Sequence, residues 1–315
     1  MIASDICNLL GIKYPVLQGG MAWVSDASLA AAVSNAGGLG IISAMALDAD
    51  ALRGELCKIK ELTDKPYGVN IMLMSPRAAD IAQVVAEEGV PVVTTGAGSP
   101  QRFMKLWKEK NTLVLPVVAS VAMAIFAERS GADAVIAEGG EAGGHVGDLT
   151  TMTLLPQVAD AVSIPVIAAG GIADGRGVAA ALMLGACGVQ VGTRFLVAKE
   201  ANIHEVYKKR VISARDIDTV TTGKRLGHPV RALRNKLTLD LLKKEFDSSV
   251  SNEEFEKYGA GALRRAVVEG DEVLGSFMAG QASGMIKKEE TAAEIVADLM
   301  EGAEKVLKGA NRWVK

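Results

Sequence analysis

The feature that most constrains the fold is a series of eight short apolar runs between residues 15 and 191. Most runs are continuous rather than alternating, which is typical of parallel strands buried on both faces. Helix-length segments separate the runs, so the sequence predicts an α/β protein built as a closed (β/α)₈ TIM barrel. An open, doubly wound sheet is the alternative, and eight units without a break favour closure. The predicted strands are Pro15–Gln18, Leu39–Ile42, Tyr67–Asn70, Val90–Thr94, Leu113–Val117, Asp133–Ala137, Pro165–Ala169 and Gly188–Val191.

Capping residues mark several of the intervening helices. Ser25 or Asp26 can cap one helix, and Asp174 can cap another, because each carries a side-chain oxygen that accepts from a free backbone N–H. The pair Ser75–Pro76 predicts a proline in the first turn of a third helix. These signals support the alternation of strands and helices.

Composition excludes several classes of protein. A formal net charge of -3 gives no electrostatic reason to expect nucleic acid or an anionic membrane. Residues 1–10 lack the pattern of a secretory signal, and no run approaches the roughly 20 apolar residues of a membrane helix. Cys7, Cys57 and Cys187 are too dispersed to predict a disulfide framework or a zinc site. We therefore expect a cytoplasmic protein without a metal site, a nucleic-acid partner or a membrane contact.

The character of the sequence changes after the eighth run. Residues 204–244 are polar, hold eleven Lys and Arg against four Asp and Glu, and lack the spacing of strands. We predict that residues 204–273 form a small inserted subdomain, basic in its first part, and that 1–203 and 274–315 form the barrel. Apolar residues at helical spacing in 288–307 predict a last helix that returns to the barrel.

Glycines and small residues gather just past the predicted strands, at what would be one rim of the barrel. Barrel enzymes build their sites from the loops at this rim. The clustering is informative because turns at the opposite rim are free to use other residues. The rim residues are Gly19, Gly20, Met21, Ala22 and Trp23 after the first strand, Asn70 in the third, Thr95–Gly98 after the fourth, Gly170–Ile172 after the seventh and Gly192–Arg194 after the eighth.

The loop after the sixth strand, Ala137–Gly147, carries five glycines, two carboxylates and His145. Glycine has no side chain to bury and is costly to order, so we expect this loop to let a ligand approach its backbone, with His145 touching that ligand. Imidazole there can donate a hydrogen bond, or a proton near neutral pH. Contact with a cofactor and support of the loop are the alternatives. Glu138 and Glu141 could orient His145 or bind a cation, and Glu141 could equally be exposed.

The other two histidines lie in the basic segment. His204 and His228 are predicted to be solvated surface residues. Three histidines this far apart in sequence do not predict a metal site.

Two rim segments suit a phosphate. Backbone N–H groups in the loops after the seventh and eighth strands of barrels often hold one, and Gly170–Gly171 and Gly192–Thr193 have the right type and position. Two tight strand–helix turns are the alternative for either pair alone, whereas both together favour a phosphate-bearing cofactor. No Gly-x-Gly-x-x-Gly follows the first strand and no Walker loop is present, which disfavours a Rossmann dinucleotide or a P-loop nucleotide.

Taken with these motifs, nearly the whole chain resembles the FMN-dependent enoyl-[acyl-carrier-protein] reductase II family, within the wider nitronate monooxygenase-like flavin barrels. The glycine loop and the motifs of the last two strands belong to the wider group and indicate FMN better than they indicate the substrate. The start Gln18–Trp23, the run Arg215–Thr219 and the run Met278–Gln281 indicate the reductase branch. The resemblance also rests on Pro66–Met72, Val93–Gly98, Ile167–Asp174, Gln190–Phe195 and Ser276–Gln281.

The resemblance implies a division of labour among the rim residues. It places the FMN phosphate against Gly170, Gly171, Gly192 and Thr193. It places the rest of the flavin against Gly20, Met21, Ala22, Asn70, Thr95, Glu138, Gly143, Gly144, Met278 and Gln281.

The resemblance also implies a reaction. Hydride would pass from NADH through FMN to the β-carbon of a trans-2-enoyl thioester carried by acyl carrier protein, and His145 would supply a hydrogen bond or a proton. It further implies a homodimer and leaves room for a monovalent cation. A basic surface beside the site, including Lys208 and Lys209, would attract the acidic carrier, with an ordinary solvated face as the alternative. The rival functions are nitronate oxidation by oxygen with His145 as base, and a non-catalytic flavin-binding barrel.

Overall fold

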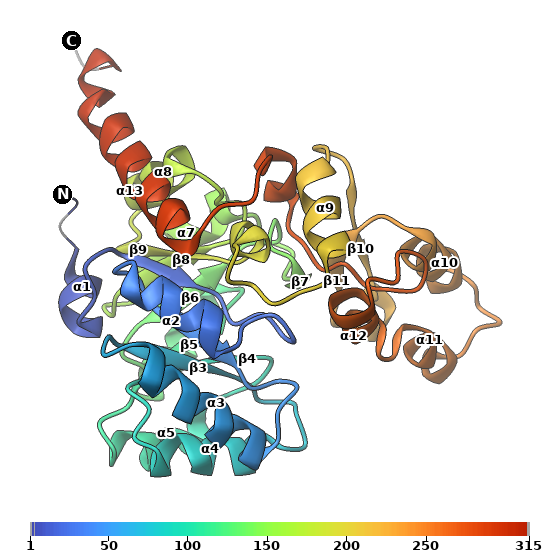
Figure 1. Cartoon of the computed structure of the whole chain (residues 1–315), viewed down its shortest axis with the longest axis horizontal. Coiled ribbons are helices and arrows are strands. Elements are labelled where there is room, and N and C mark those ends of the chain that lie inside the picture. The colour runs from blue at the N-terminus through green and yellow to red at the C-terminus, as the bar shows by residue number, and fades with distance from the viewer. Residues whose placement is uncertain (1, 3, 314–315) are drawn as a thin grey trace.

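The computed structural model of the chain describes residues 2 and 4–313, and it is a (β/α)₈ barrel, as predicted. Eight parallel strands follow the order β1-β9-β8-β6-β5-β4-β3-β2. A parallel bridge between Leu17 and Leu39 joins β1 to the start of β2, which closes the ring (Figure 1). The strands are β1 (Val16–Gln18), β2 (Gly40–Ser43), β3 (Tyr67–Met72), β4 (Val92–Gly96), β5 (Leu113–Val118), β6 (Val135–Glu138), β8 (Val166–Ala169) and β9 (Gly188–Val191).

Burial on both faces explains why the strands appear as continuous apolar runs. On β6, Ile136 lies in a core cluster with Leu17, Ile41 and Ile167 from other strands. Its chain neighbours Val135 and Ala137 belong to a different cluster that also contains helix residues. Successive side chains of a strand point to opposite faces, so each strand contributes to two apolar layers at once.

Helices surround the strands and begin largely where the capping signals place them. The Asp26 carboxylate accepts from the Leu29 N–H at 3.0 Å, and Asp174 accepts from two N–H groups of the helix that it precedes. The prediction at Ser75–Pro76 was wrong in detail, because these residues form a separate turn before α4. The surrounding helices are α1 (Asp5–Leu10), α2 (Ala27–Asn35), α3 (Ala49–Leu62), α4 (Ala78–Glu87), α5 (Gln101–Lys108), α6 (Val121–Arg129), α7 (Thr151–Ala161) and α8 (Gly175–Met183).

The predicted last helix is α13 (Ala292–Lys308), which packs against α8 and α2. Its buried face includes Ile295, Val296 and Leu299, while Val306 near its end is exposed. Among the described residues, no helix has both the length and the apolar content to cross a bilayer.

A second, small sheet lies beside the barrel, and it corrects the prediction that residues 204–244 contain no strands. Strands β10 (Thr219–Thr222) and β11 (Val230–Leu233) form an antiparallel hairpin, and β11 also pairs with β7 (Gly144–His145) inside the glycine loop. The two hairpin strands are only four residues long and are flanked by charged residues, so their β-branched content gives a weak signal. This pairing joins the chain after the eighth barrel strand to the loop that follows the sixth.

The remaining helices extend away from the barrel on the side of this small sheet (Figure 1). Helix α9 places Tyr207 and Val211 in the main core, whereas Leu237, Leu241 and Phe255 belong to a small core of their own. The division of the chain at 204–273 stays a prediction, and its outer limits at residues 1 and 315 lie outside the described residues. These helices are α9 (Glu205–Ser213), α10 (Lys236–Glu245), α11 (Asn252–Gly259) and α12 (Ala262–Arg264).

Arg194, just past β9, fixes the returning C-terminal segment to the barrel. Its guanidinium donates to Glu290 and Asp298, each at 2.8 Å, and to the Ala173 carbonyl at 2.6 Å. The Arg194 and Glu290 side chains are only 9% and 8% exposed. Without Arg194, the buried Glu290 carboxylate would keep only the exposed Lys288, whose ammonium lies 2.8 Å from it, as an ion-pair partner.

We predict that Arg194→Leu lowers the free energy of unfolding by about 3 kcal/mol, because Glu290 loses its buried partner. Urea denaturation measures the change. The matched control is Lys209→Met, which breaks an ion pair whose two side chains are 75% and 82% exposed and should cost less than about 1 kcal/mol. Equal losses in the two variants would contradict this account of Arg194.

Candidate functional site

The candidate site is the rim at the carboxyl ends of the barrel strands, where the chain segment Phe277–Gln281 returns to meet the glycine loop. The Gly280 N–H donates to Thr193 Oγ1 at 2.9 Å, and the Gln281 N–H donates to the Glu141 carbonyl at 2.9 Å. The Tyr207 hydroxyl donates to the Met278 carbonyl at 2.7 Å. The segment is therefore held by β9, the glycine loop and α9 together.

The glycines of the loop are required first by the chain's own packing. A Cβ at Gly143 would lie 2.6 Å from the carbonyl carbon of Ala279, and one at Gly147 would lie 2.7 Å from the Ala119 methyl. A Cβ at Gly139 would overlap Thr151, and Gly144 has φ +80°. At Gly139, Gly143 and Gly147 the groups that approach the backbone belong to the protein itself, and the approach of a ligand to this loop stays a prediction.

Glu141 and Glu138 have different surroundings. The Glu141 carboxylate accepts from the N–H and hydroxyl of Thr151 at 2.9 and 3.0 Å, so it secures the start of α7. Simple exposure, one of the alternatives left open for Glu141, is therefore wrong, since its side chain is half-buried and bonded to Thr151. Glu138 lies at the carboxyl end of β6, where burial raises the pKa of its carboxyl to about 7. A carboxyl in this state can change protonation near neutral pH.

His145 lies on β7 and keeps an exposed side chain. The imidazole of His228 is its neighbour, with the two ring centroids 6.1 Å apart. Partial desolvation and the charge of His228 both lower the pKa of His145 below its ordinary value. His145 is thus neutral at pH 7, when an imidazole has one N–H donor and one acceptor nitrogen.

Sequence reasoning missed the significance of His228 and the role of Arg231. His228 is exposed, as predicted, but it lies beside His145 rather than on an unrelated face. Arg231 donates to the Gly140 carbonyl at 2.9 and 3.1 Å and so holds the glycine loop to the hairpin. The only available signal was the short β-branched pattern of the hairpin. His204, also exposed, accepts from the Val206 N–H at the start of α9.

Contacts bring the predicted cofactor residues together at the rim. Gly20 lies against Asn70, the Met21 sulfur lies 3.8 Å from a Cβ built on Gly192, and the Met278 sulfur lies 3.7 Å from one built on Gly144. The remaining predicted residues take similar positions. Ala22 follows Met21, Thr95 lies next to the last residue of β4, and Glu138 ends β6. Gly170 lies against the Gly139 carbonyl, and Gly171 lies beside Glu141. Hydrogen bonds at Thr193 and Gln281 hold the returning segment.

Two observations indicate that this rim suits a ligand with a phosphate. Thr95 Oγ1 is buried without a hydrogen-bond partner, which is a cost that a bound polar group would remove. Gly192 precedes the short helix η1 (Thr193–Val197), whose first N–H groups have no partner within the helix. Gly171, with φ +74°, also presents its backbone at this rim without a side chain. Within the described residues, no group of three or more His, Cys, Asp or Glu is placed to hold a metal ion.

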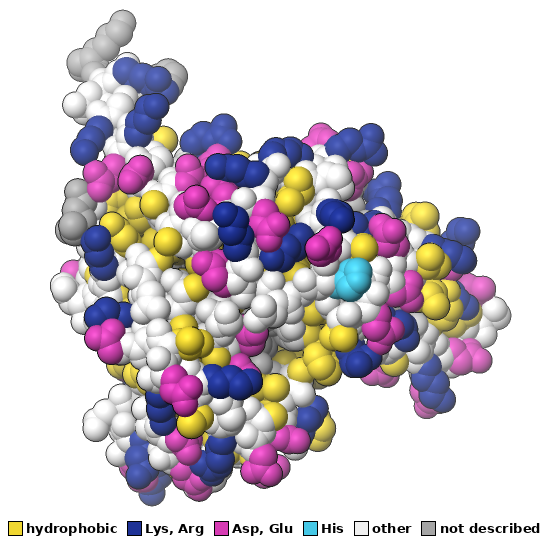
Figure 2. Space-filling model, in the orientation of Figure 1, with side chains coloured by type: hydrophobic (Ala, Val, Ile, Leu, Met, Phe, Trp, Pro, Cys, Tyr) yellow, Lys and Arg dark blue, Asp and Glu magenta, His cyan; other side chains and the backbone are white. Residues whose placement is uncertain are grey.

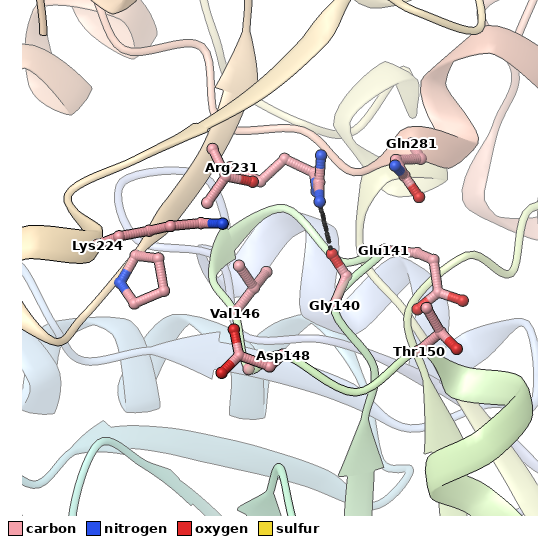
Figure 3. A pocket seen from close by; sticks show the side chains of 11 residues that line it. Gly140, Glu141, Val146, Asp148, Thr150, Lys224, Arg231 and Gln281 are labelled. Atoms are coloured by element: carbon pink, nitrogen blue, oxygen red, sulfur yellow. Dashed lines mark hydrogen bonds between the residues drawn. The ribbon is translucent and has the colours of Figure 1, made fainter. Parts of the chain in front are cut away.

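A polar cavity of ≈ 160 Å³ lies between the glycine loop and the hairpin (Figure 3). Lys224 and Arg231 line it from the hairpin, Asp148 lines it from the loop, and Gln281 lines it from the returning segment. The cavity therefore adjoins the rim on the side away from the barrel strands. Its mixed charges suit a polar group rather than an acyl chain.

Comparison with known proteins gives the family. The sequence profile of nitronate monooxygenase matches residues 3–302. The chain belongs to the nitronate monooxygenase family. This is a family of FMN-dependent oxidoreductases.

Individual relatives carry several names. The solved structure of FabK from Thermotoga maritima has 48% sequence identity to the chain and a TM-score of 0.97, with 100% of each chain covered. A (3aS,4S,5R,7aS)-5-hydroxy-7a-methyl-1-oxo-octahydro-1H-indene-4-carboxyl-CoA dehydrogenase from Mycobacterium tuberculosis is 42% identical over 75% of this chain and 67% of its own length. A probable nitronate monooxygenase from Staphylococcus saprophyticus is 33% identical over 91% of this chain and 94% of its own.

Gly143→Ala should destabilise the protein, because its Cβ must displace the Ala279 backbone. We predict a loss of about 2 kcal/mol in the free energy of unfolding, measured by urea denaturation. Gly54→Ala is the matched control, since Gly54 lies exposed in α3 with nothing within 4 Å of an added Cβ. An equal or smaller effect at Gly143 would refute the close approach.

Glu138→Gln should change how stability depends on pH. Between pH 4.5 and about 7, the folded protein keeps a proton on Glu138 that the unfolded chain has lost, so wild-type stability falls as pH rises through this window. Glu138→Gln has no carboxyl at this position, so it lacks the fall in stability that Glu138 causes in the wild type. In protein freed of flavin, we expect it to be more stable than wild type by about 2 kcal/mol at pH 8, less than for a fully buried carboxyl because Glu138 is partly exposed.

Thermal or urea unfolding at pH 4 and pH 8 tests this prediction, with pH 4 as the internal control. At pH 4 the carboxyl is protonated in both states, and the pH-dependent advantage of the variant should be absent. An advantage of the same size at both pH values would contradict the assignment.

Proposed function

We propose that the protein reduces trans-2-enoyl thioesters on acyl carrier protein, with NADH as the donor and bound FMN as the carrier of hydride. The observation that carries the proposal is the match to FabK, an enoyl-ACP reductase II, over the full length of both chains. The rim adds glycine and polar residues from several strand ends, with His145 in one of its loops. The name of the carboxyl-CoA dehydrogenase relative likewise refers to a coenzyme A thioester.

The proposed cofactor site follows from the contacts of the rim. The backbone of Gly170, Gly171, Gly192 and Thr193 would hold the phosphate of FMN, because these residues offer N–H groups without bulky side chains. Thr95 and Asn70 offer polar groups deeper in the rim, where the Asn70 amide donates to Thr94 Oγ1 at 2.9 Å. When bound, FMN would supply the hydride transfer from NADH to the β-carbon of the substrate.

The proposed role of His145 is hydrogen-bond donation. Hydride arrival at the β-carbon leaves negative charge on the thioester oxygen, and a neutral imidazole N–H beside that oxygen stabilises it. Transfer of a proton from solvent water to the α-carbon then completes the saturated acyl group. The exposed position of His145 leaves room for a substrate entering from solvent.

Lys208 and Lys209, which the sequence placed in a possible carrier-binding surface, both form ion pairs within the chain. Lys208 is not a free surface cation, since its ammonium donates to the Ala198 carbonyl and to Glu289, each at 2.7 Å. Lys209 is exposed but pairs with Glu205. Figure 2 shows cations and anions interspersed over the face that it displays. Acyl carrier protein, a homodimer, a monovalent cation and a cytoplasmic location all remain proposals.

Nitronate oxidation is the second candidate function, because the family and the Staphylococcus saprophyticus relative carry that name. In that reaction His145 would act as a base toward the substrate and oxygen would accept electrons. The two functions use one flavin site with different acceptors. They are therefore separated by what oxidises the reduced protein.

Anaerobic stopped-flow absorbance tests the proposal. NADH should bleach the bound flavin, and crotonyl-CoA, as a small enoyl thioester, should restore its absorbance as butyryl-CoA forms. We expect His145→Ala to leave reduction by NADH intact and to slow reoxidation by about 100-fold.

His204→Ala is the matched control, because it removes another exposed histidine that directly precedes α9, outside the rim. It should leave both half-reactions unchanged. Failure of crotonyl-CoA to reoxidise the wild-type protein, with flavin reduction by a nitronate and reoxidation by oxygen instead, would replace the reductase function with the monooxygenase function. Normal reoxidation in His145→Ala would refute the role of His145 alone.

A further inference from the structure

The backbone around His145 places a second imidazole beside it. His145 pairs with Val230 in the ladder between β7 and β11, and the Val146 N–H donates to the Pro229 carbonyl at 3.0 Å. His228 directly precedes these residues. The two rings come to 6.1 Å between centroids, with their planes inclined by 60°.

Several features hold His228 in this place. The turn before it is bracketed by Gly223 and Gly227, whose φ values of +87° and +78° favour glycine. Pro229 restricts the chain directly after it. Two residues after Pro229, Arg231 donates two hydrogen bonds to the Gly140 carbonyl, which hold the hairpin to the glycine loop. The position of His228 relative to His145 is therefore set by backbone geometry and not by a flexible surface loop.

We propose that His228 is a positioning residue that keeps the His145 imidazole neutral, so that His145 serves as a hydrogen-bond donor at the rim. Two imidazolium ions at this separation repel each other, so a proton on His228 makes a proton on His145 less favourable. Partial desolvation of His145, the larger cause, lowers its pKa in the same direction.

Other charged groups surround the same loop, but the charge that acts on His145 comes from His228. Positive groups lie on the hairpin and negative groups on the loop and on the strand beneath it. These groups are Lys224 and Arg231, and Glu138, Glu141 and Asp148. Because both signs are present, they do not replace the specific effect of the adjacent imidazole.

The catalytic meaning of this pair rests on the proposed function, whereas the interaction between the two rings does not. If neutral His145 donates a hydrogen bond to the thioester oxygen, its protonation weakens catalysis, because an imidazolium, although also a donor, would give its proton to that oxygen and delay protonation of the α-carbon. Activity would then fall as His145 takes up a proton at low pH. His228 would extend activity toward lower pH without itself touching the substrate.

Two substitutions separate charge from shape. His228→Gln never carries a charge, whereas His228→Lys carries a positive charge throughout the relevant range. We expect the titration midpoint of His145 to rise by about 0.5 pH units in His228→Gln and to fall below the wild-type value in His228→Lys. A purely structural role for His228 would not produce this order.

Nuclear magnetic resonance of ¹³C-labelled histidine in the flavin-loaded protein measures the midpoint directly. The chain has only three histidines, and His204→Gln assigns the third signal and serves as the control that should not move His145. Midpoints that stay the same in wild type and His228→Gln overturn the proposal. This comparison stands even if His228→Lys fails to fold.

The pH profile of enoyl-thioester turnover provides a second readout. The acidic limb of kcat/KM should shift to higher pH in His228→Gln and to lower pH in His228→Lys, by the same amounts as the resonance midpoints. Moved midpoints with an unmoved profile would overturn the catalytic meaning of the pair. Absence of enoyl turnover in the wild type would instead refute the proposed function and leave the resonance result to be judged alone.

Discussion

The close approach of two backbone segments, Gly143 of the loop after β6 and Ala279–Gly280 of the returning chain, determines the shape of the rim. A Cβ at Gly143 would lie 2.6 Å from the Ala279 carbonyl carbon, and one at Gly280 would lie 2.6 Å from the Glu141 carbonyl oxygen. Neither distance admits a side chain. Glycine is therefore required in both segments at this contact.

The rest of the site depends on that contact. With the returning segment in place, the Gly280 N–H reaches Thr193 and the Met278 sulfur lies beside Gly144. The same loop carries β7, whose pairing with β11 brings His145 and His228 together. The arrangement joins the ends of β6 and β9 to residues distant in sequence.

Much of the barrel could be predicted from sequence because burial on both faces gives parallel strands an apolar composition that local inspection detects. The rim could be located for a related reason, since small residues past strand ends follow from the topology of a barrel. Predicted positions such as Gly143 and Gly192 lie at this rim. The reason for several loop glycines was different from the expected one, since at Gly139 and Gly143 the partner is the protein itself.

What could not be predicted depends on long-range pairing. Strands β10 and β11 are short and gain their stability from each other and from β7, which no local pattern records. The contact of His228 with His145 was not predicted because the two residues are 83 positions apart in the chain. Glu141 likewise finds its partner Thr151 only once the loop closes on α7. Each of these contacts is set by the folded backbone rather than by residue type.

Hydrogen exchange, measured by mass spectrometry on the protein with and without FMN, tests the central claim that the glycine loop and the returning segment form one flavin site. The account predicts that FMN slows amide exchange in residues 139–147 and in residues 277–281 together, along with residues 170–171 and 192–193. Slowing confined to other parts of the barrel, or slowing of one of the first two segments without the other, would contradict it.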